Sequence, residues 1–331
     1  MSLKLPGQWV WDSWYAFDGE QHHAFYLQAS RALQNPHRRH LNPSVGHAVS
    51  TDLKNWTVVA DAIYPSQDDA DWDSWTTWTG SVVQDDNGLW WMFYTGNSRA
   101  TDCKVQTIGA ATSKDLMTWT KVEGNPLVTA DPRWYAKYIP GGERSEDFRD
   151  PWVFRFPDDQ STWHMLMTAR DKNGPSRQDA IMGHATSKNL IDWEMQPPLS
   201  IGGQGFGETE VFQFEIVDGV PIVLYCCGPI WLSEARLAAG EIGGIYSLPV
   251  SADLSDVDFN RAVLFDGPTP GYENAKVKPN PALYASRLVK DTAGGWNLIA
   301  FRNETLDGEF IGELTDPIPV TADPSKGLIR R

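Results

Sequence analysis

Residues 46–56 read GHAVSTDLKNW, residues 109–119 read GAATSKDLMTW, and residues 183–193 read GHATSKNLIDW. A weaker fourth copy, PVSADLSDVDF, occupies residues 249–259. The serines of the four copies are 63, 74 and 64 residues apart, at Ser50, Ser113, Ser187 and Ser251. Each copy has the pattern of a short apolar strand followed by a Ser-x-Asp/Asn-Leu turn and an aromatic residue. The chain therefore repeats one strand-and-turn unit roughly every 65 residues.

A second series of strands interleaves with these copies. The segments are short, aromatic or β-branched, and bounded by turn residues. They are HHAFYLQAS (22–30), WWMFYTG (90–96), WHMLMTA (163–169), PIVLYCCG (221–228) and WNLIAFRN (296–303). Another strand precedes each of them, often ending in an Asp-Gly or Asn-Gly hairpin turn. Five such units predict an all-β, five-bladed β-propeller, with sheets arranged radially about a channel.

No helical periodicity and no linker interrupts this pattern, so residues 1–331 are predicted to form a single propeller domain. Residues 30–45, 64–76 and 120–147 are the longest insertions between strands. Insertions between blades commonly rim one face of a propeller, and we expect these to do so.

Composition excludes several classes of partner. The chain has 28 Lys and Arg against 43 Asp and Glu, a net charge of −15. This acidity argues against binding to nucleic acid or to an anionic membrane surface. No apolar run approaches the ~20 residues of a membrane helix. The first residues lack an apolar segment of signal-peptide length, so we expect a cytoplasmic protein. The three cysteines show neither metal-site spacing nor a disulfide framework.

Three of the five predicted first strands carry a carboxylate near their start. These residues are Asp12 in WVWDSW, Asp150 in FRDP and Glu210 in GETEVF. The first strand of each blade lines the channel, so the three acids should converge. A buried acid is costly unless it is paired or functional. Convergent carboxylates suit glycoside chemistry, in which one acid attacks or activates water and another protonates the leaving oxygen.

A bound metal ion is the rival explanation for three convergent acids. Arg149 lies next to Asp150, and its guanidinium would repel a cation while hydrogen-bonding well to sugar hydroxyls. We therefore expect no metal and no cofactor. The predicted partner is a small-molecule or oligosaccharide substrate, and the oligomeric state is left open.

These segments resemble motifs of the glycoside hydrolase clan of families 32 and 68, the levansucrase and β-fructofuranosidase-like enzymes, with family 43 more distant. WDSW (11–14) resembles the nucleophile motif of family 68, and WTGS (78–81) is similar to a segment of both families. RDP (149–151) matches the transition-state stabiliser motif, and ETE (208–210) resembles the acid/base segment. The resemblance implies a retaining glycosidase or transglycosidase that acts on β-fructofuranosidic bonds through a covalent fructosyl-enzyme.

The resemblance also assigns residues to roles. Asp12 would be the nucleophile, Asp150 the stabiliser and Glu210 the acid/base. The substrate-binding residues would be Trp11, Trp14, Trp78, Thr79, Arg149 and Glu208. Four features depart from the relatives. Val211 stands where levansucrases have arginine, and YCCGPIW (225–231) lacks another of their arginines. The family 32 signature Asn-Asp-Pro-Asn-Gly is absent, and no residues remain for the C-terminal β-sandwich of that family. The two missing arginines belong to the leaving-group side, so the leaving group is left open.

Two alternative functions remain. One is an inverting arabinosidase or xylosidase like those of family 43, with Asp12 as a general base; the other is a non-catalytic carbohydrate-binding propeller. Several residues are expected to be structural. His47 and His184 should be packed core histidines, residues 37–40 (HRRH) a solvated loop, and Cys226-Cys227 part of a buried strand.

Overall fold

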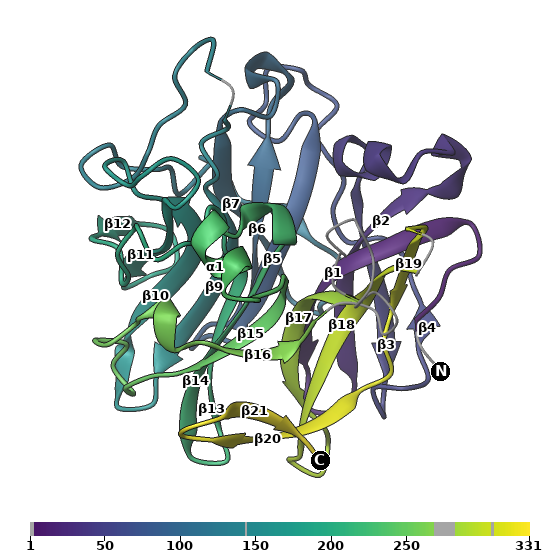
Figure 1. Cartoon of the computed structure of the whole chain (residues 1–331). Helices are drawn as coiled ribbons and strands as arrows, with labels where there is room; N and C mark the ends of the chain where they lie inside the picture. Colours follow the sequence, from purple (N-terminus) through teal and green to yellow (C-terminus); the bar gives the residue numbers. More distant parts are fainter. Residues whose placement is uncertain (1–2, 143, 268–281, 306–307) are drawn as a thin grey trace.

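The computed structural model describes residues 3–142, 144–267, 282–305 and 308–331, and these residues form five antiparallel sheets (Figure 1). The first sheet contains β1 (Gln8–Phe17), β2 (His22–Ser30), β3 (Ser44–Ser50) and β4 (Thr57–Val58). The second contains β5 (Thr76–Gln84), β6 (Trp90–Asn97), β7 (Gln106–Ser113) and β8 (Thr120–Lys121). The third contains β9 (Arg149–Phe156), β10 (Asp159–Arg170), β11 (Ala180–Ser187) and β12 (Trp193–Gln196).

The fourth sheet contains β13 (Glu210–Val217), β14 (Val220–Cys227), β15 (Gly244–Pro249) and β16 (Val263–Asp266). The fifth contains β17 (Leu283–Lys290), β18 (Trp296–Glu304), β19 (Phe310–Leu314), β20 (Ile318–Asp323) and β21 (Gly327–Arg330). In the fifth sheet, β19 and β20 both pair with β18, and β20 continues to β21. The order of strands within each sheet follows the chain, as a propeller blade requires.

The first strands of the sheets close into a ring. Strand β1 contacts β5, β5 contacts β9, β9 contacts β13, β13 contacts β17, and β17 returns to β1. The N-terminal segment joins the fifth blade at this closure, because the backbone N–H of Leu314 in β19 donates to the carbonyl of Leu3 at 3.1 Å. The predicted five-bladed β-propeller is confirmed.

The repeated turn has a hydrogen-bonding reason for its sequence. In the first copy, the Asp52 carboxylate accepts the backbone N–H groups of Lys54 and Asn55 at 2.8 and 2.7 Å. This bonding turns the chain so sharply that Leu53 takes a φ of 61° while its side chain remains 1% exposed. The equivalent leucines adopt the same left-handed conformation, at Leu116, Leu190 and Leu254. A short polar side chain that bonds its own backbone therefore ends the third strand of a blade.

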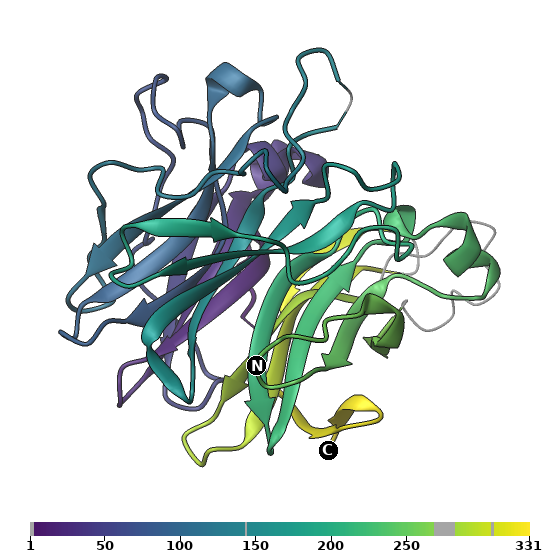
Figure 2. The same ribbon diagram turned by 90° about the vertical axis from the view of Figure 1, so that its left-hand side faces the viewer.

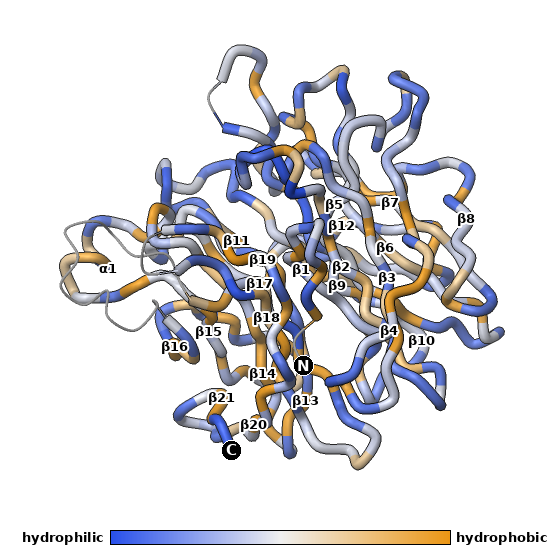
Figure 3. The backbone as a smooth tube through the Cα atoms, turned by 90° about the vertical axis from the view of Figure 1, so that its right-hand side faces the viewer, coloured by the Kyte–Doolittle hydropathy of each residue, from blue (hydrophilic) through white to orange (hydrophobic). Residues whose placement is uncertain are grey.

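The hydrophobic core lies between adjacent blades. One cluster joins Phe93 of β6 to Met165 of β10, and the next joins Leu166 of β10 to Phe212 of β13. Figure 3 shows the apolar residues concentrated along the strands and the polar ones in the loops. The prediction for His47 is confirmed, since it is fully buried and its Nε2 lies 2.9 Å from Nδ1 of His23.

Long loops gather at one end of the molecule, and the β20–β21 hairpin lies at the other (Figures 1 and 2). Helical segments are short. They are η1 (Arg31–Leu33), η2 (Pro36–Leu41), η3 (Arg99–Thr101), η4 (Pro229–Trp231), α1 (Glu234–Ala238) and η5 (Phe259–Arg261). Among the described residues, no helix has the length or apolar character needed to cross a membrane.

Candidate active site

Each of the innermost strands in the described sheets contains a β-bulge, one residue more than its partner strand. In β1, Trp11 pairs with Leu27 and Ser13 with Tyr26, so Asp12 has no partner. Thr79 is the unpartnered residue of β5. The pairing of β9, β13 and β17 likewise skips one residue, at 150–151, 211–212 and 285–286. A bulge re-aims side chains, and here it turns them toward the propeller axis.

The backbone is strained at three of these bulges. Asp150 has a φ of 58°, Val211 a φ of 59° and Ala285 a φ of 43°. These values lie in the left-handed region, which residues other than glycine uncommonly adopt and which is least favourable for a β-branched residue such as Val211. Such a conformation costs of order 1–3 kcal/mol and persists only where surrounding bonds enforce it. At Asp150 the backbone N–H donates to Thr95 Oγ1 at 2.9 Å, which is one such bond.

The bulges surround a pocket of about 540 Å³. The strand residues at or next to a bulge that line it are Trp11, Asp12, Trp78, Thr79, Arg149, Asp150, Glu210, Val211 and Tyr284. The structure therefore brings together the three predicted acids with four of the predicted substrate-binding residues, and a fifth, Glu208, joins them from the segment before β13. Asp12 and Asp150 occupy equivalent positions of their strands, at the bulge, as predicted. Glu210 precedes its bulge and takes the position of Arg149 in β9.

Trp14 does not line the pocket, so its prediction as a substrate-binding residue was wrong. In a regular strand Trp14 would share the face of Asp12, two residues before it. The bulge at Asp12 breaks this alternation and turns Trp14 into the core. There it is fully buried, with its ring stacked 6.4 Å from that of Phe25.

Asp12 lies among apolar and acidic neighbours. Its Oδ2 accepts a hydrogen bond from Thr79 Oγ1, which supports the carboxylate from the neighbouring blade. The pKa of Asp12 is raised to about 7, mainly because burial removes the carboxyl group from water. The nearby charge of Asp150 also raises this pKa, and its effect is larger than the opposite effect of the Thr79 hydrogen bond. Desolvation also raises the pKa of Asp150, although Arg149 opposes this and Thr168 Oγ1 donates to its Oδ2 at 3.0 Å.

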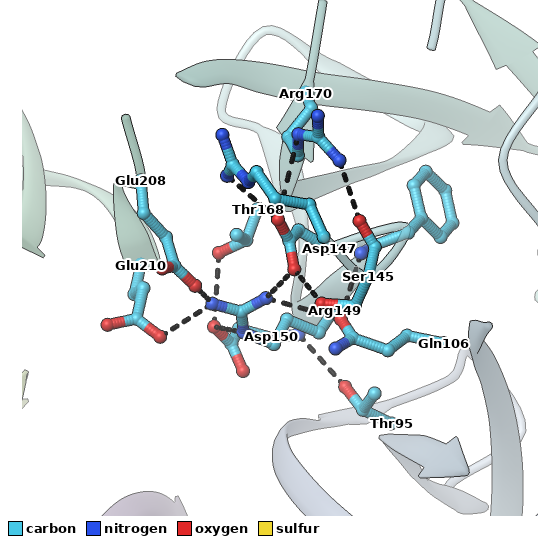
Figure 4. Close-up of polar contacts among 12 residues, drawn as sticks. Thr95, Gln106, Ser145, Asp147, Arg149, Asp150, Thr168, Arg170, Glu208 and Glu210 are labelled. Carbon is cyan, nitrogen blue, oxygen red and sulfur yellow. Dashed lines mark hydrogen bonds and ion pairs between the residues drawn. The ribbon is translucent and has the colours of Figure 1, made fainter. Parts of the chain in front are cut away.

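Arg149 lies among the carboxyl groups of the pocket and contacts several of them (Figure 4). Its Nη2 contacts Glu208 Oε1 and lies 2.7 Å from Glu210 Oε1. Its Nη1 donates to Gln106 Oε1 at 3.2 Å, and its Nε lies 3.5 Å from Asp150 Oδ2. Protein acceptors therefore engage Arg149 on every nitrogen. In this structure it positions carboxylates and has little capacity left for sugar hydroxyls.

Tyr284 is a pocket residue that sequence reasoning missed. Its hydroxyl donates to Glu210 Oε2 at 2.7 Å, so Glu210 is held between Tyr284 and Arg149. Tyr284 directly precedes the bulge of β17, as Glu210 precedes that of β13. A search of the repeat positions for any polar residue, rather than for acids alone, would have found it.

The prediction for residues 37–40 was wrong in part. This segment belongs to η2, and His37, Arg39 and His40 line the pocket while Arg38 is exposed. The segment is held down because Trp78 Nε1 donates to the carbonyl of His40 at 2.8 Å. A run of basic residues in an insertion is typical of a solvated loop, and nothing in the sequence shows that Trp78 binds this segment to the pocket.

Neutralising Asp12 should make the protein more stable at neutral and alkaline pH. The folded chain holds the Asp12 proton up to about pH 7, because burial raises the pKa of this carboxyl, whereas an unfolded chain releases it near the ordinary aspartate pKa of 3.8. Between these values the unfolded state binds fewer protons, so wild-type stability falls as pH rises. Asp12→Asn lacks this loss, and its Tm should exceed that of wild type increasingly from pH 4 to pH 7. A constant difference in Tm across that range, measured by calorimetry, would contradict a raised pKa.

A propeller whose axial pocket gathers carboxyl groups is suited to the chemistry of glycosidic bonds. The family model "Glycosyl hydrolases family 32 N-terminal domain" matches residues 13–231 of the chain. The chain therefore belongs to glycosyl hydrolases family 32. The matched region begins one residue after Asp12 and ends after the fourth-blade strand β14.

The curated relatives are β-fructofuranosidases and fructosyltransferases. The chain is 34% identical over 260 residues to β-fructofuranosidase, insoluble isoenzyme CWINV5, of Arabidopsis thaliana, covering 76% of this chain and 42% of the relative. It is 30% identical to sucrose:sucrose 1-fructosyltransferase of Festuca arundinacea, covering 55% of this chain and 25% of the relative. The chain thus spans well under half the length of these relatives.

Solved structures share the fold. An inulosucrase from Halalkalicoccus jeotgali bound to kestose superimposes with a TM-score of 0.74 at 19% identity, covering 98% of this chain and 87% of that one. The fold is thus common to this chain and to that inulosucrase.

Proposed function

We propose that the protein is a retaining glycosidase or transglycosidase that transfers the fructosyl unit of β-fructofuranosides to water or to another sugar. The observation that carries this proposal is the convergence of Asp12, Asp150 and Glu210 on one pocket in a chain of family 32. The names of the relatives supply the substrate class, since both the invertase and the transferase act on fructosides.

In the proposed first step, ionised Asp12 attacks the anomeric carbon and the bond to the leaving oxygen breaks. Glu210 donates its proton to that oxygen, so the leaving sugar departs as a neutral alcohol. In the second step, Glu210 takes a proton from water or an acceptor hydroxyl, which displaces Asp12. Asp150 supports both steps by accepting hydrogen bonds from ring hydroxyls as positive charge develops on the sugar.

The positions of the carboxylates support these roles. Thr79, on the inner strand of the neighbouring blade, donates a hydrogen bond to Asp12. This bond holds the Asp12 carboxylate in one orientation for attack. Glu210 lines the same pocket from another blade, held by Arg149 and Tyr284. An attacking group and a proton donor from different blades can thus face the same glycosidic bond from two sides.

The experiment that tests the proposal is a substrate panel read by the sugar released. Sucrose, 1-kestose, inulin- and levan-type oligosaccharides and aryl arabinosides are incubated with the protein. Release of fructose with initial retention of the anomeric configuration, followed by NMR, is the expected result. Release of arabinose with inversion would contradict the proposal in favour of a family 43-like reaction. Binding without turnover on the whole panel would indicate a carbohydrate-binding propeller.

A further inference from the structure

Arg39 is a buried cation of the pocket that the protein leaves mostly unsatisfied. It lies on η2 and is 9% exposed. Its guanidinium lies 3.8 Å from the ring centroid of Phe310 and 5.6 Å from that of Trp11. These two rings fix the group in place and leave its edge beside the pocket that Arg39 lines.

A guanidinium carries five N–H donors, and burial without acceptors is costly. Among the described residues, Arg39 makes one hydrogen bond, from Nη1 to the carbonyl of Pro36 at 2.9 Å. Its Nε is buried without a partner, and no carboxylate of the described part of the chain lies within 4.0 Å. Arg149 and Arg144, which line the same pocket, each contact two or more carboxylates: Glu208 and Glu210 in the case of Arg149, and Asp147 and Asp179 in the case of Arg144.

The surroundings of Arg39 favour neutral oxygen acceptors over an anion. The pocket is acidic, with carboxyl groups at Asp12, Asp147, Asp150, Glu208, Glu210 and Glu304. An anionic substituent would meet this acidic field, whereas sugar hydroxyls accept hydrogen bonds from a guanidinium without that penalty.

The position of Arg39 selects which sugar unit it meets. Its guanidinium packs on Trp11, the residue directly before Asp12, and so lies on the side of the attacking carboxylate. The wall formed by residues 228–231 belongs to a different blade, next to Glu208. We propose that Arg39 binds hydroxyls of the fructosyl unit that is transferred. This inference rests on the proposed function and adds a specificity-determining residue to it.

The test compares Arg39→Met, which keeps a stem of similar length against Phe310 but has no donors, with Arg39→Lys, which keeps one charged donor group. Arg38→Met is the matched control, because Arg38 neighbours Arg39 on η2, is exposed and does not line the pocket. Two readouts are used: kcat/KM on sucrose and 1-kestose, and the inhibition constant of D-fructose. Tm is recorded for each variant to separate binding from folding.

Arg39→Met should lower kcat/KM about 10- to 100-fold and weaken D-fructose inhibition similarly, because a charged hydrogen bond is lost. Arg39→Lys should fall between this variant and wild type, and Arg38→Met should stay within about twofold. If Arg39→Met keeps both its turnover and its inhibition by D-fructose, the proposed role of Arg39 is overturned while the proposed function stands. If Arg39→Met does not fold, wild-type inhibition by D-fructose in Arg39→Lys would overturn it. Failure of wild type itself on every fructoside would instead contradict the proposed function.

Discussion

Replacing Asp12 by asparagine should abolish nearly all turnover, with a loss of at least about 10³-fold in kcat on sucrose or 1-kestose. The neutral amide has almost the same shape and can still accept the Thr79 hydrogen bond, but it cannot form the ester of a fructosyl-enzyme. The loss should appear in kcat with little change in the D-fructose inhibition constant, since binding does not require the attacking oxygen.

The control for this variant is Asp69→Asn, an equally small change at a side chain that is 83% exposed. It should retain wild-type kinetics. Circular dichroism and Tm must show that Asp12→Asn is folded, and its expected gain in stability above pH 7 makes unfolding a poor explanation for lost activity. If the folded variant keeps a tenth of wild-type activity, Asp12 is not the nucleophile.

The second large effect separates Glu210 from Glu208, whose carboxylates both contact Nη2 of Arg149. Glu210→Ala should lower kcat on sucrose by about 10²–10⁴-fold, the usual contribution of a general acid/base. With β-D-fructofuranosyl fluoride, whose leaving group departs without protonation, formation of the fructosyl-enzyme should be nearly normal. Added azide should then accelerate turnover, because a small anion attacks without a general base.

Glu208→Ala is the matched control. It removes the same functional group from the same arginine, while Tyr284 and Arg149 still hold Glu210. We expect its kcat on the fluoride and on sucrose to decrease in parallel, without azide rescue. Azide rescue in Glu208→Ala and its absence in Glu210→Ala, followed by chromatography of the fructosyl azide, would reverse the two roles.

The fold could be predicted from the repeat, because hydrogen bonds within each copy of the repeat determine its local conformation. A Ser-x-Asp-Leu turn bonds its own backbone, as Asp52 shows, so the same letters give the same turn in different blades. The candidate acids were predictable for a related reason. The start of each inner strand lies near the axis in all described blades, and acids at that point must converge.

The remainder of the site depends on features that the letters do not show. A bulge has no sequence signature here, so the resemblance of WDSW (11–14) to a family motif did not show that the extra residue Asp12 turns Trp14 into the core. Arg39 reaches the pocket because its segment packs against Phe310, which is 271 residues away in the chain and belongs to another blade. Contacts of this kind form only when the ring of blades closes, and no local sequence pattern predicts them.

The bulges also determine which changes this fold can accept. Because Asp12 and Thr79 have no partner across the strand, another side chain at either position would leave strand pairing and core packing as they are. Deletion is different: removing Thr79 would make Trp78 and Gly80 neighbours in a regular strand, since they already pair with the adjacent residues Thr95 and Tyr94. The pairing of Gly80–Gln84 would be kept, but the bulge and the hydroxyl that donates to Asp12 would be lost. Evolution can therefore diversify the chemistry of such a propeller through substitutions at these positions, while the length of each inner strand stays fixed.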